Sequence, residues 1–527
     1  MEGLPKKETQ PRLLIIGLDS ATFDLILPWI GEGDLPNLAR LIRDGVSGPL
    51  RSTIPPSSPP AWTSFMTGKN PGKHGVFDFV EPEPGSYGAR FTSGASRRAR
   101  TLWRILSDAG VSVGVINLPM TYPPEPVRGY LLAGMDTPDE NTSFVHPPEL
   151  QQELARRFGS LPLVVSYMRQ RVARGYRSQI QVVREWEEIE EKRAEVCLYL
   201  MEHHKTDLVM LHFFAIDQLQ HHFWHYMDPG HPWFDPVGAR TVGDPIRPIY
   251  RKADEIVGRL ISKLPADSHV IVLSDHGAGP LLGPTVYLNE YLAQIGMLSF
   301  RGSGESGRGF HRFYAHLEEA YSMAHKLLPR WVRAWLARRY RRAKSRLDSF
   351  LAVSRIDWQR TKAFCPEVFR TGAYIRVNLR GREPEGIVEP GTEYEEVVTY
   401  LMARLQELKH PQDGKPVIAQ LHRRDEIFHG PYLPNAPDLF LDNWEAGGFQ
   451  IKPSSPRKLG RPIVVSQSDV WIPGELSGGH RYDGILVMTG KASRPGPESP
   501  APGSSTWPRR SSACSVCRSR TISMGGS

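Results

Sequence analysis

The chain has 527 residues, of which 40% are hydrophobic and 23% charged, and its formal net charge is +8. This composition is typical of a folded globular protein with a large apolar core. No apolar run approaches the roughly 20 residues that cross a bilayer, the first residues lack the apolar stretch of a secretory signal, and four cysteines are too few for a disulfide framework. We therefore expect neither a membrane-spanning nor a secreted protein, and the reducing cytoplasm is the expected location.

Three short apolar runs predict buried parallel strands, because they are continuously apolar and do not alternate with polar residues. Helical patterns lie between them, and strands that alternate with helices predict a layered α/β sheet. The predicted strands are residues 13–18, 208–211 and 270–273, and the helical patterns include residues 36–43, 100–109 and 182–201.

An aspartate follows each predicted strand within a few residues: Asp19, Asp217 and Asp275. In parallel sheets ligands collect at the carboxyl ends of the strands, so these three carboxylates are expected to meet at one edge. Aspartate is also common after strands as a turn or helix-capping residue, which explains any one of the three taken alone.

A different composition begins near residue 301, and we expect a mostly helical cap over residues 301–425 between core segments 1–300 and 426–490. Residues 326–346 contain nine basic residues, no acidic residue and interleaved tryptophans. The favoured interpretation is a cap helix that packs its tryptophans on the core; peripheral docking to a membrane surface and binding of an anionic substrate stay open. Residues 436–441 predict a strand that returns to the core sheet.

Histidines complete a set of candidate metal ligands. Asp and His stand four residues apart in the segment 217–221, one helical turn, and an adjacent Asp-His pair ends the strand at 273. Three aspartates and three histidines provide two three-ligand sites for borderline divalent ions such as zinc or manganese, each with a position open for substrate. The six candidates are Asp19, Asp217, His221, Asp275, His276 and His480.

Ser58 lies in the proline-rich segment 55–65 and is a candidate nucleophile. A serine hydroxyl is a weak nucleophile at neutral pH and needs a base or a metal to activate it. By composition alone the segment reads as a proline-rich loop, and only the resemblance described next favours catalysis. The following segment, 67–75, lacks the spacing of an NTPase phosphate loop, which excludes that function.

Four segments together resemble the alkaline phosphatase superfamily, and more closely its type I phosphodiesterase/nucleotide pyrophosphatase family, in the branch of predicted phosphohydrolases and phosphomutases. They are residues 16–19, 59–75, 274–277 and 479–480, and the resemblance extends over residues 12–490. It implies a layered α/β/α core and a metal-dependent phosphoester hydrolase with a small-molecule substrate. Ala61 stands where nucleotide pyrophosphatases usually carry asparagine, so nucleotide specificity is not implied.

The resemblance also implies roles for individual residues. Ser58 matches the nucleophile, and two divalent ions, zinc first and manganese second, match the cofactors. Asp19, Asp275 and His276 match the ligands of the ion that holds the nucleophile, and Asp217, His221 and His480 match those of the other ion. The implied reaction passes through a phosphoserine intermediate, because one ion activates the hydroxyl and the other stabilises the leaving oxygen.

Other functions use the same residues. A phosphomutase or phosphotransferase would need the same ions, and a non-catalytic metal-binding protein on this scaffold is the alternative from another class. No Cys-x-Pro-x-Arg segment supports a sulfatase, and no constellation supports a glycosidase or a nucleic-acid-binding protein. His74, His222 and His225 are expected near the site without being ligands.

The last segment, residues 491–527, is dominated by Ser, Pro, Gly and Arg, which predicts disorder. It holds six basic residues and one acidic residue, so the isoelectric point near 9.2 does not indicate a nucleic-acid partner. A shifted reading frame over residues 505–527 permits the pattern with which the family usually continues. We therefore hypothesise a frameshift shortly after Met488, which would remove the last core elements and produce a catalytically impaired member.

Overall fold

The computed structural model describes residues 11–138, 142–161, 163–165, 168–301, 355–366, 373–410, 414–444, 449–454, 463–465 and 475–490. The basic segment 326–346 and the segment 491–527 lie outside the described residues. No helix in the described ranges is long and apolar enough to cross a membrane.

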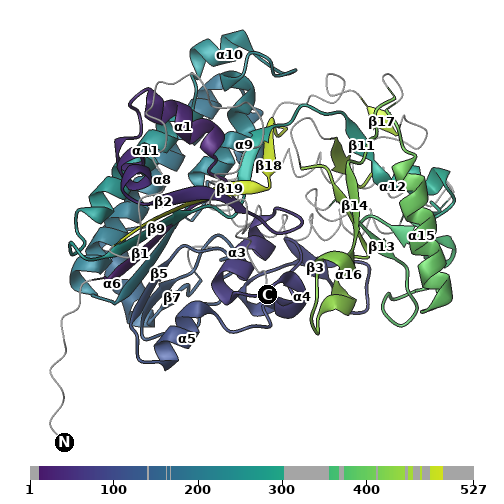
Figure 1. Ribbon diagram of the computed structural model, residues 1–527, viewed down its shortest axis with the longest axis horizontal. Coiled ribbons are helices and arrows are strands. Elements are labelled where there is room, and N and C mark those ends of the chain that lie inside the picture. Colours follow the sequence, from purple (N-terminus) through teal and green to yellow (C-terminus); the bar gives the residue numbers. More distant parts are fainter. Residues whose placement is uncertain are drawn as a thin grey trace, which may run out of the picture.

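An eight-stranded sheet forms the centre of the fold, with the strand order β2-β19-β9-β1-β8-β5-β6-β7 (Figure 1). The central strands β9, β1, β8, β5 and β6 run parallel, while β2, β19 and β7 are antiparallel to their neighbours. The strands are β1 (Leu13–Leu18), β2 (Val46–Arg51), β5 (Val113–Ile116), β6 (Gly129–Leu132), β7 (Val145–His146), β8 (Leu208–Phe213), β9 (His269–Leu273) and β19 (Asp483–Thr489). The predicted mixed α/β fold with its mostly parallel sheet is confirmed.

Helices cover both faces of this sheet: α1, α8 and α11 lie on one face, and α3 and α5 on the other (Figure 1). Helix α11 shows why, because Ile249, Ala253, Ile256 and Leu260 recur at helical spacing and are all buried. The helices are α1 (Phe23–Gly31), α2 (Pro36–Asp44), α3 (Ser58–Thr67), α5 (Leu102–Asp108), α6 (Pro148–Phe158), α8 (Tyr176–His203), α9 (Ala215–Met227) and α11 (Ile246–Ile261).

A second unit with its own apolar core lies beside the sheet, to the right in Figure 1. It contains a four-stranded antiparallel sheet, β12-β13-β15-β14, a three-stranded sheet, β16-β11-β17, and helices α12 and α15. Its elements are β11 (Thr285–Tyr287), α12 (Leu288–Gln294), β12 (Ala363–Phe364), β13 (Tyr374–Val377), α15 (Thr392–Gln406), β14 (Gln420–Arg423), β15 (Leu439–Asp442), β16 (Gln450–Lys452) and β17 (Val464–Val465). The described part of the expected helical cap therefore combines strands with helices.

Strand β15 corrects one prediction, because residues 436–441 do not return to the central sheet. Strand β15 pairs with β13 and β14, and the chain re-enters the central sheet at β19. The misleading signal has a physical cause: Leu439 and Leu441 face one apolar cluster, while Phe440 faces another. A strand covered on both faces has the continuous apolar sequence expected of a central strand.

Shorter elements connect these layers. They are α4 (Pro71–His74), β3 (Val80–Pro82), β4 (Ala89–Phe91), α7 (Met168–Val172), α10 (Pro236–Thr241), β10 (Gly277–Pro280), α16 (Arg424–Ile427) and β18 (Gly478–Arg481). The antiparallel pair β10–β18 lies near the carboxyl ends of the central strands and carries His480.

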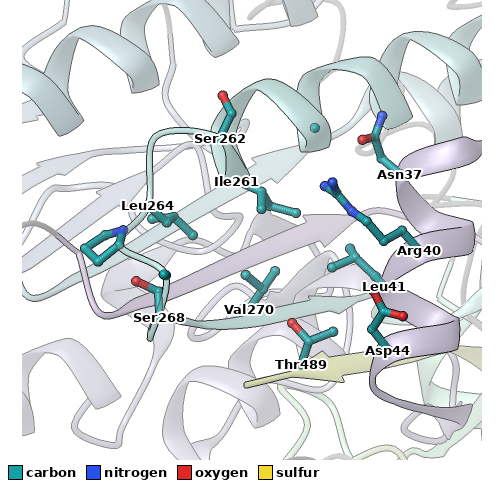
Figure 2. A pocket seen from close by; sticks show the side chains of 13 residues that line it. Asn37, Arg40, Leu41, Asp44, Ile261, Ser262, Leu264, Ser268, Val270 and Thr489 are labelled. Carbon is teal, nitrogen blue, oxygen red and sulfur yellow. The ribbon is translucent and has the colours of Figure 1, made fainter. Parts of the chain in front are cut away.

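A cavity of about 510 Å³ lies between α2, α11 and the start of β9. Figure 2 shows the side chains of Arg40, Leu41, Ile261 and Val270 gathered around it. Val270 lies near the start of β9, whereas Asp275 follows the end of that strand. The cavity therefore lies at the opposite edge of the sheet from the expected site.

Candidate metal centre

Three aspartates meet where adjacent parallel strands end. Asp19 directly follows β1, Asp217 lies in the first turn of α9 after β8, and Asp275 lies just beyond β9. Because β1 lies between β8 and β9 and runs parallel to both, their carboxyl ends share one edge. All three carboxylates are at most 3% exposed, so the expected convergence is observed.

The histidines reach the same edge by two routes. His221 is one helical turn after Asp217 on α9, and His276 directly follows Asp275. His480 arrives from far along the chain because β18 pairs with β10, which stacks the His480 ring on the His276 ring at 3.7 Å. The close packing of β18 on helix α9 requires Gly478, because a Cβ there would lie 2.3 Å from the backbone oxygen of Gln220.

The ligand-type atoms form two groups of three. In the first group, His276 Nε2 lies 3.2 Å from Asp275 Oδ2 and 3.9 Å from Asp19 Oδ1. In the second group, Asp217 Oδ1 lies 3.2 Å from His221 Nε2 and 3.6 Å from His480 Nε2. His276 also lies within reach of Asp217 and His480, so it stands between the groups. The structure thus brings all six predicted ligands together.

Each histidine presents only one nitrogen to the centre. The Nδ1 atoms lie 2.7 Å from Gly478 O for His221, 3.1 Å from Gly277 O for His276 and 2.7 Å from Pro56 O for His480. Because a carbonyl oxygen only accepts, each Nδ1 carries the donated proton, and a neutral ring then directs its Nε2 lone pair inward. The Nε2 atoms of His221 and His480 are 2.9 Å apart, so a proton or a cation must lie between them to offset the repulsion.

Each carboxylate likewise presents one oxygen. Trp62 Nε1 and His212 Nε2 donate to Asp19 Oδ2, Gln218 Nε2 donates to Asp217 Oδ2, and Ser20 N donates to Asp275 Oδ1. Among the residues that the structure describes, the other oxygen of each is buried without a hydrogen-bond partner. A buried polar atom without a partner costs about 1–3 kcal/mol, which a cation would offset. Six residues therefore each direct one free ligand atom toward the centre, and this set fits a site for two metal ions.

The protonation equilibria reflect the crowding of negative charge. Burial, then the charges of Asp275 and Asp217, raise the pKa of Asp19 well above its usual range, and burial and Asp217 raise the pKa of Asp275 to about 7. Burial acts to raise the pKa of Asp217, but His221 and His480 outweigh it and hold that pKa well below its usual range. Positive charge at this edge therefore stabilises the ionised carboxylates.

Burial also decides the protonation state of two of the histidines. It lowers the pKa of His276 and of His480 to about 4. Both rings are therefore neutral at neutral pH, the form that binds metal.

Ser58 is the first residue of α3 and is 2% exposed. Its Oγ lies 3.3 Å from His276 Nε2, beside the first group. The segment that composition assigns to a loop begins a helix, because Pro59 and Pro60 occupy the first turn, where a missing N–H costs nothing. The helix holds the Ser58 hydroxyl against the metal candidates.

Trp62 and His212 contact the site but were not identified from the sequence. A signal existed for His212, since it is a polar residue inside the otherwise apolar strand β8. The histidines expected nearby lie outside the six-atom set: His74 Nε2 contacts Ser64 Oγ at 3.0 Å, and His225 Nδ1 contacts Ser477 Oγ at 2.9 Å. His222 is buried, with Nδ1 lacking a partner among the described residues.

The family described as type I phosphodiesterase/nucleotide pyrophosphatase matches residues 13–451. The chain belongs to this family. It is therefore a hydrolase of the alkaline phosphatase superfamily, as the residues in its sequence implied. The matched range includes Ser58 and every candidate ligand except His480, which follows it.

Solved structures show the same fold. Phosphonoacetate hydrolase from Sinorhizobium meliloti 1021 in complex with phosphonoacetate has a TM-score of 0.52 at 14% identity, covering 91% of this chain and 90% of that chain. The same enzyme in complex with phosphonoformate has a TM-score of 0.50 at 13% identity, with the same coverage. At these identities the likeness shows the fold alone. A comparison with curated protein sequences found no match.

Proposed function

We propose that this family member is a metal-dependent phosphoester hydrolase that uses Ser58 as its nucleophile and two divalent ions as cofactors. The observation that supports this proposal is the set of six residues that each direct one free ligand atom toward a common centre, with the Ser58 hydroxyl beside it. Nitrogen and carboxylate ligands in groups of three suit zinc first and manganese second.

The two groups have different tasks in this proposal. Asp19, Asp275 and His276 hold the ion next to Ser58, and Asp217, His221 and His480 hold the other. When bound, such ions lower the pKa of a nearby hydroxyl and offset negative charge on phosphoryl oxygens.

Helix α3 orients the nucleophile. Ser58 Oγ gives up its proton and forms a bond to phosphorus as the ester P–O bond breaks, and the departing alkoxide takes up one proton. Water then bonds to phosphorus as the bond to Ser58 Oγ breaks, which releases phosphate, and a proton from the water restores the serine hydroxyl. Pro59 and Pro60 have no N–H, and the N–H of Ala61 is bonded to Ser57 O at 3.0 Å. The first turn of α3 therefore offers the phosphoryl oxygens only the N–H of Ser58, so charge compensation depends on cations.

The test measures turnover by the full chain loaded with zinc or manganese. Its substrates are p-nitrophenyl phosphate, bis-p-nitrophenyl phosphate and phosphonoacetate, the last because a neighbour in fold was solved with it. We expect chelator-sensitive release of p-nitrophenol, and loss of about a thousandfold or more in kcat for Ser58→Ala. Phosphate that remains on a second hydroxyl instead of appearing free would favour the phosphotransferase alternative.

Ser57→Ala is the matched control. Ser57 is also 2% exposed, precedes the nucleophile directly and makes no capping hydrogen bond through its side chain. We expect this variant to stay within about twofold of wild type, since it removes a buried hydroxyl without touching the reacting atoms. Full activity of Ser58→Ala, or no turnover by metal-loaded wild type, would overturn the proposed function.

A further inference from the structure

Asp19 is held by side chains from two other elements, Trp62 on α3 and His212 on β8. We propose that these three residues, here called the Asp19 clamp, make Asp19 a one-oxygen metal ligand and fix the nucleophile helix relative to the metal centre. The inference rests on the proposed function, because it assigns Trp62 and His212 as positioning residues for the ion beside Ser58.

The two oxygens of Asp19 differ in their hydrogen bonds. Trp62 Nε1 donates to Oδ2 at 3.0 Å and His212 Nε2 donates to the same oxygen at 2.8 Å, while Oδ1 has no hydrogen-bond partner in the described part of the chain. Two donors occupy the lone pairs of Oδ2 and orient the carboxylate, so an ion binds at Oδ1 alone.

The clamp also positions the nucleophile, because Trp62 lies four residues after Ser58 on α3 and so shares its face of the helix. The indole N–H joins this face to Asp19 at the end of β1. The Trp62 ring is 1% exposed and meets the His212 ring edge to face at 4.9 Å, which prevents it from turning away. The distance from Ser58 Oγ to Asp19 Oδ1 is therefore set by this contact.

The clamp requires a glycine at position 17, because a side chain there would collide with the rings of the clamp. A Cβ at Gly17 would lie 2.5 Å from Cη2 of Trp62 and 3.3 Å from Cδ2 of His212. Gly17 pairs with His212 in the β1–β8 register, so both rings pack over a strand position without a side chain. A methyl group there would displace Trp62 without removing any polar atom.

Asp217 and Asp275 have weaker support from the rest of the chain. Among the described residues, each of their bonded oxygens accepts from one donor: Gln218 Nε2 at 2.9 Å for Asp217 and Ser20 N at 3.3 Å for Asp275. Loss of the clamp donors should therefore weaken the ion held by Asp19, Asp275 and His276 and leave the other ion in place.

The experiment titrates metal into the full chain against a competing chelator and records the visible spectrum of the cobalt(II)-loaded protein. The variants are Trp62→Phe, His212→Leu, His212→Gln and Gly17→Ala. Trp62→Phe, His212→Leu and Gly17→Ala should keep one ion at wild-type affinity and bind the other about 10–100-fold more weakly. Their cobalt bands should lose intensity as Asp19 becomes bidentate, and kcat should fall with little change in KM. His212→Gln keeps an N–H donor and should restore part of the affinity.

Trp103→Phe is the matched control, because Trp103 on α5 is fully buried and its indole also donates to a carboxylate, that of Glu125, which is not a candidate ligand. It should bind both ions as wild type does. Two ions bound with wild-type affinity and an unchanged cobalt spectrum in all four clamp variants would overturn the clamp alone. Wild-type protein that binds no metal would overturn the proposed function and the clamp with it.

Discussion

Asp438 in the second unit and the three aspartates at the edge of the central sheet are all buried, but their negative charges are balanced in different ways. In the second unit, both oxygens of Asp438 have partners: Arg382 donates to both, Tyr394 donates to one, and the Val377 N–H donates to the other. At the carboxyl edge of the central sheet, Asp19, Asp217 and Asp275 each keep one buried oxygen for which the described residues provide no hydrogen-bond donor. Arginines neutralise Asp438 within the fold, whereas the three aspartates at the sheet edge need a cation from outside.

The pKa values show the same contrast. Burial acts to raise the pKa of Asp438, but Arg382 outweighs it and the pKa is lowered. Burial and neighbouring carboxylates raise the pKa of Asp19 and Asp275. A buried carboxylate whose charge the chain balances serves stability, and one whose charge the chain leaves unbalanced is a candidate for function.

The largest expected effect separates activity from stability at Asp275. Asp275→Asn keeps an acceptor for the Ser20 N–H but removes one ligand charge, so we expect activity to fall about a thousandfold or more. The metal-free variant should be at least as stable as the metal-free wild type, because repulsion with Asp19 and Asp217 decreases. Kinetics and urea unfolding in chelator measure the two effects, and a clear loss of metal-free stability would contradict the comparison.

The converse change is Asp438→Asn, which removes the buried carboxylate shared by Arg382 and Arg424 and leaves Arg382 paired with Glu383 alone. Breaking a buried ion pair on one side costs about 3–5 kcal/mol in the free energy of unfolding. Metal content of the folded fraction should stay at the wild-type value. Urea unfolding and elemental analysis check this, and a selective loss of metal without destabilisation would show that Asp438 belongs to the site.

Metal and pH should act together at the sheet edge. Without metal, Asp275 keeps its proton up to about pH 7, whereas an unfolded aspartate releases it near pH 4. Between these values the unfolded state binds fewer protons, so this group lowers the free energy of unfolding as pH rises. Added zinc should therefore raise the melting temperature more at pH 8 than at pH 5.

Asp438 provides the opposite sign for comparison. Its lowered pKa means that its contribution to stability is present above about pH 4 and is lost only in stronger acid. Thermal melts of wild type and Asp438→Asn, with zinc and with chelator, distinguish the groups. An equal effect of zinc at both pH values would refute the role assigned to the unpaired oxygens.

The smallest expected effect concerns Gln218, the side-chain donor to Asp217 Oδ2. Gln218 is partly exposed, so water can replace its amide in Gln218→Leu. We expect the ion held by Asp217, His221 and His480 to lose at most about tenfold in affinity, while the affinity for the ion beside Ser58 stays unchanged. Chelator competition measures both affinities, and a loss confined to the ion beside Ser58 would reverse the assignment of the two groups.

The sequence alone predicts three of the central strands and the aspartates that follow them. The runs 13–18, 208–211 and 270–273 lie in β1, β8 and β9, because strands buried on both faces must be apolar throughout. The aspartates after them converge because parallel neighbours end at one edge. The segment around Ser58 has the composition of a loop, and only the family resemblance predicts a nucleophile there. His480 is a candidate ligand from the sequence, but its assignment to the second ion comes from the resemblance.

The contacts between segments far apart in the sequence were decided only by the tertiary structure. The β10–β18 pairing places His480 on His276, and the partners of Asp19 Oδ2 come from α3 and β8. The same holds for β15, whose apolar run fits either sheet until its neighbours are known. Apolar periodicity reports whether a residue is buried, but the choice of partner across the chain depends on packing among distant segments, and that choice determines which oxygen of each carboxylate remains for a metal.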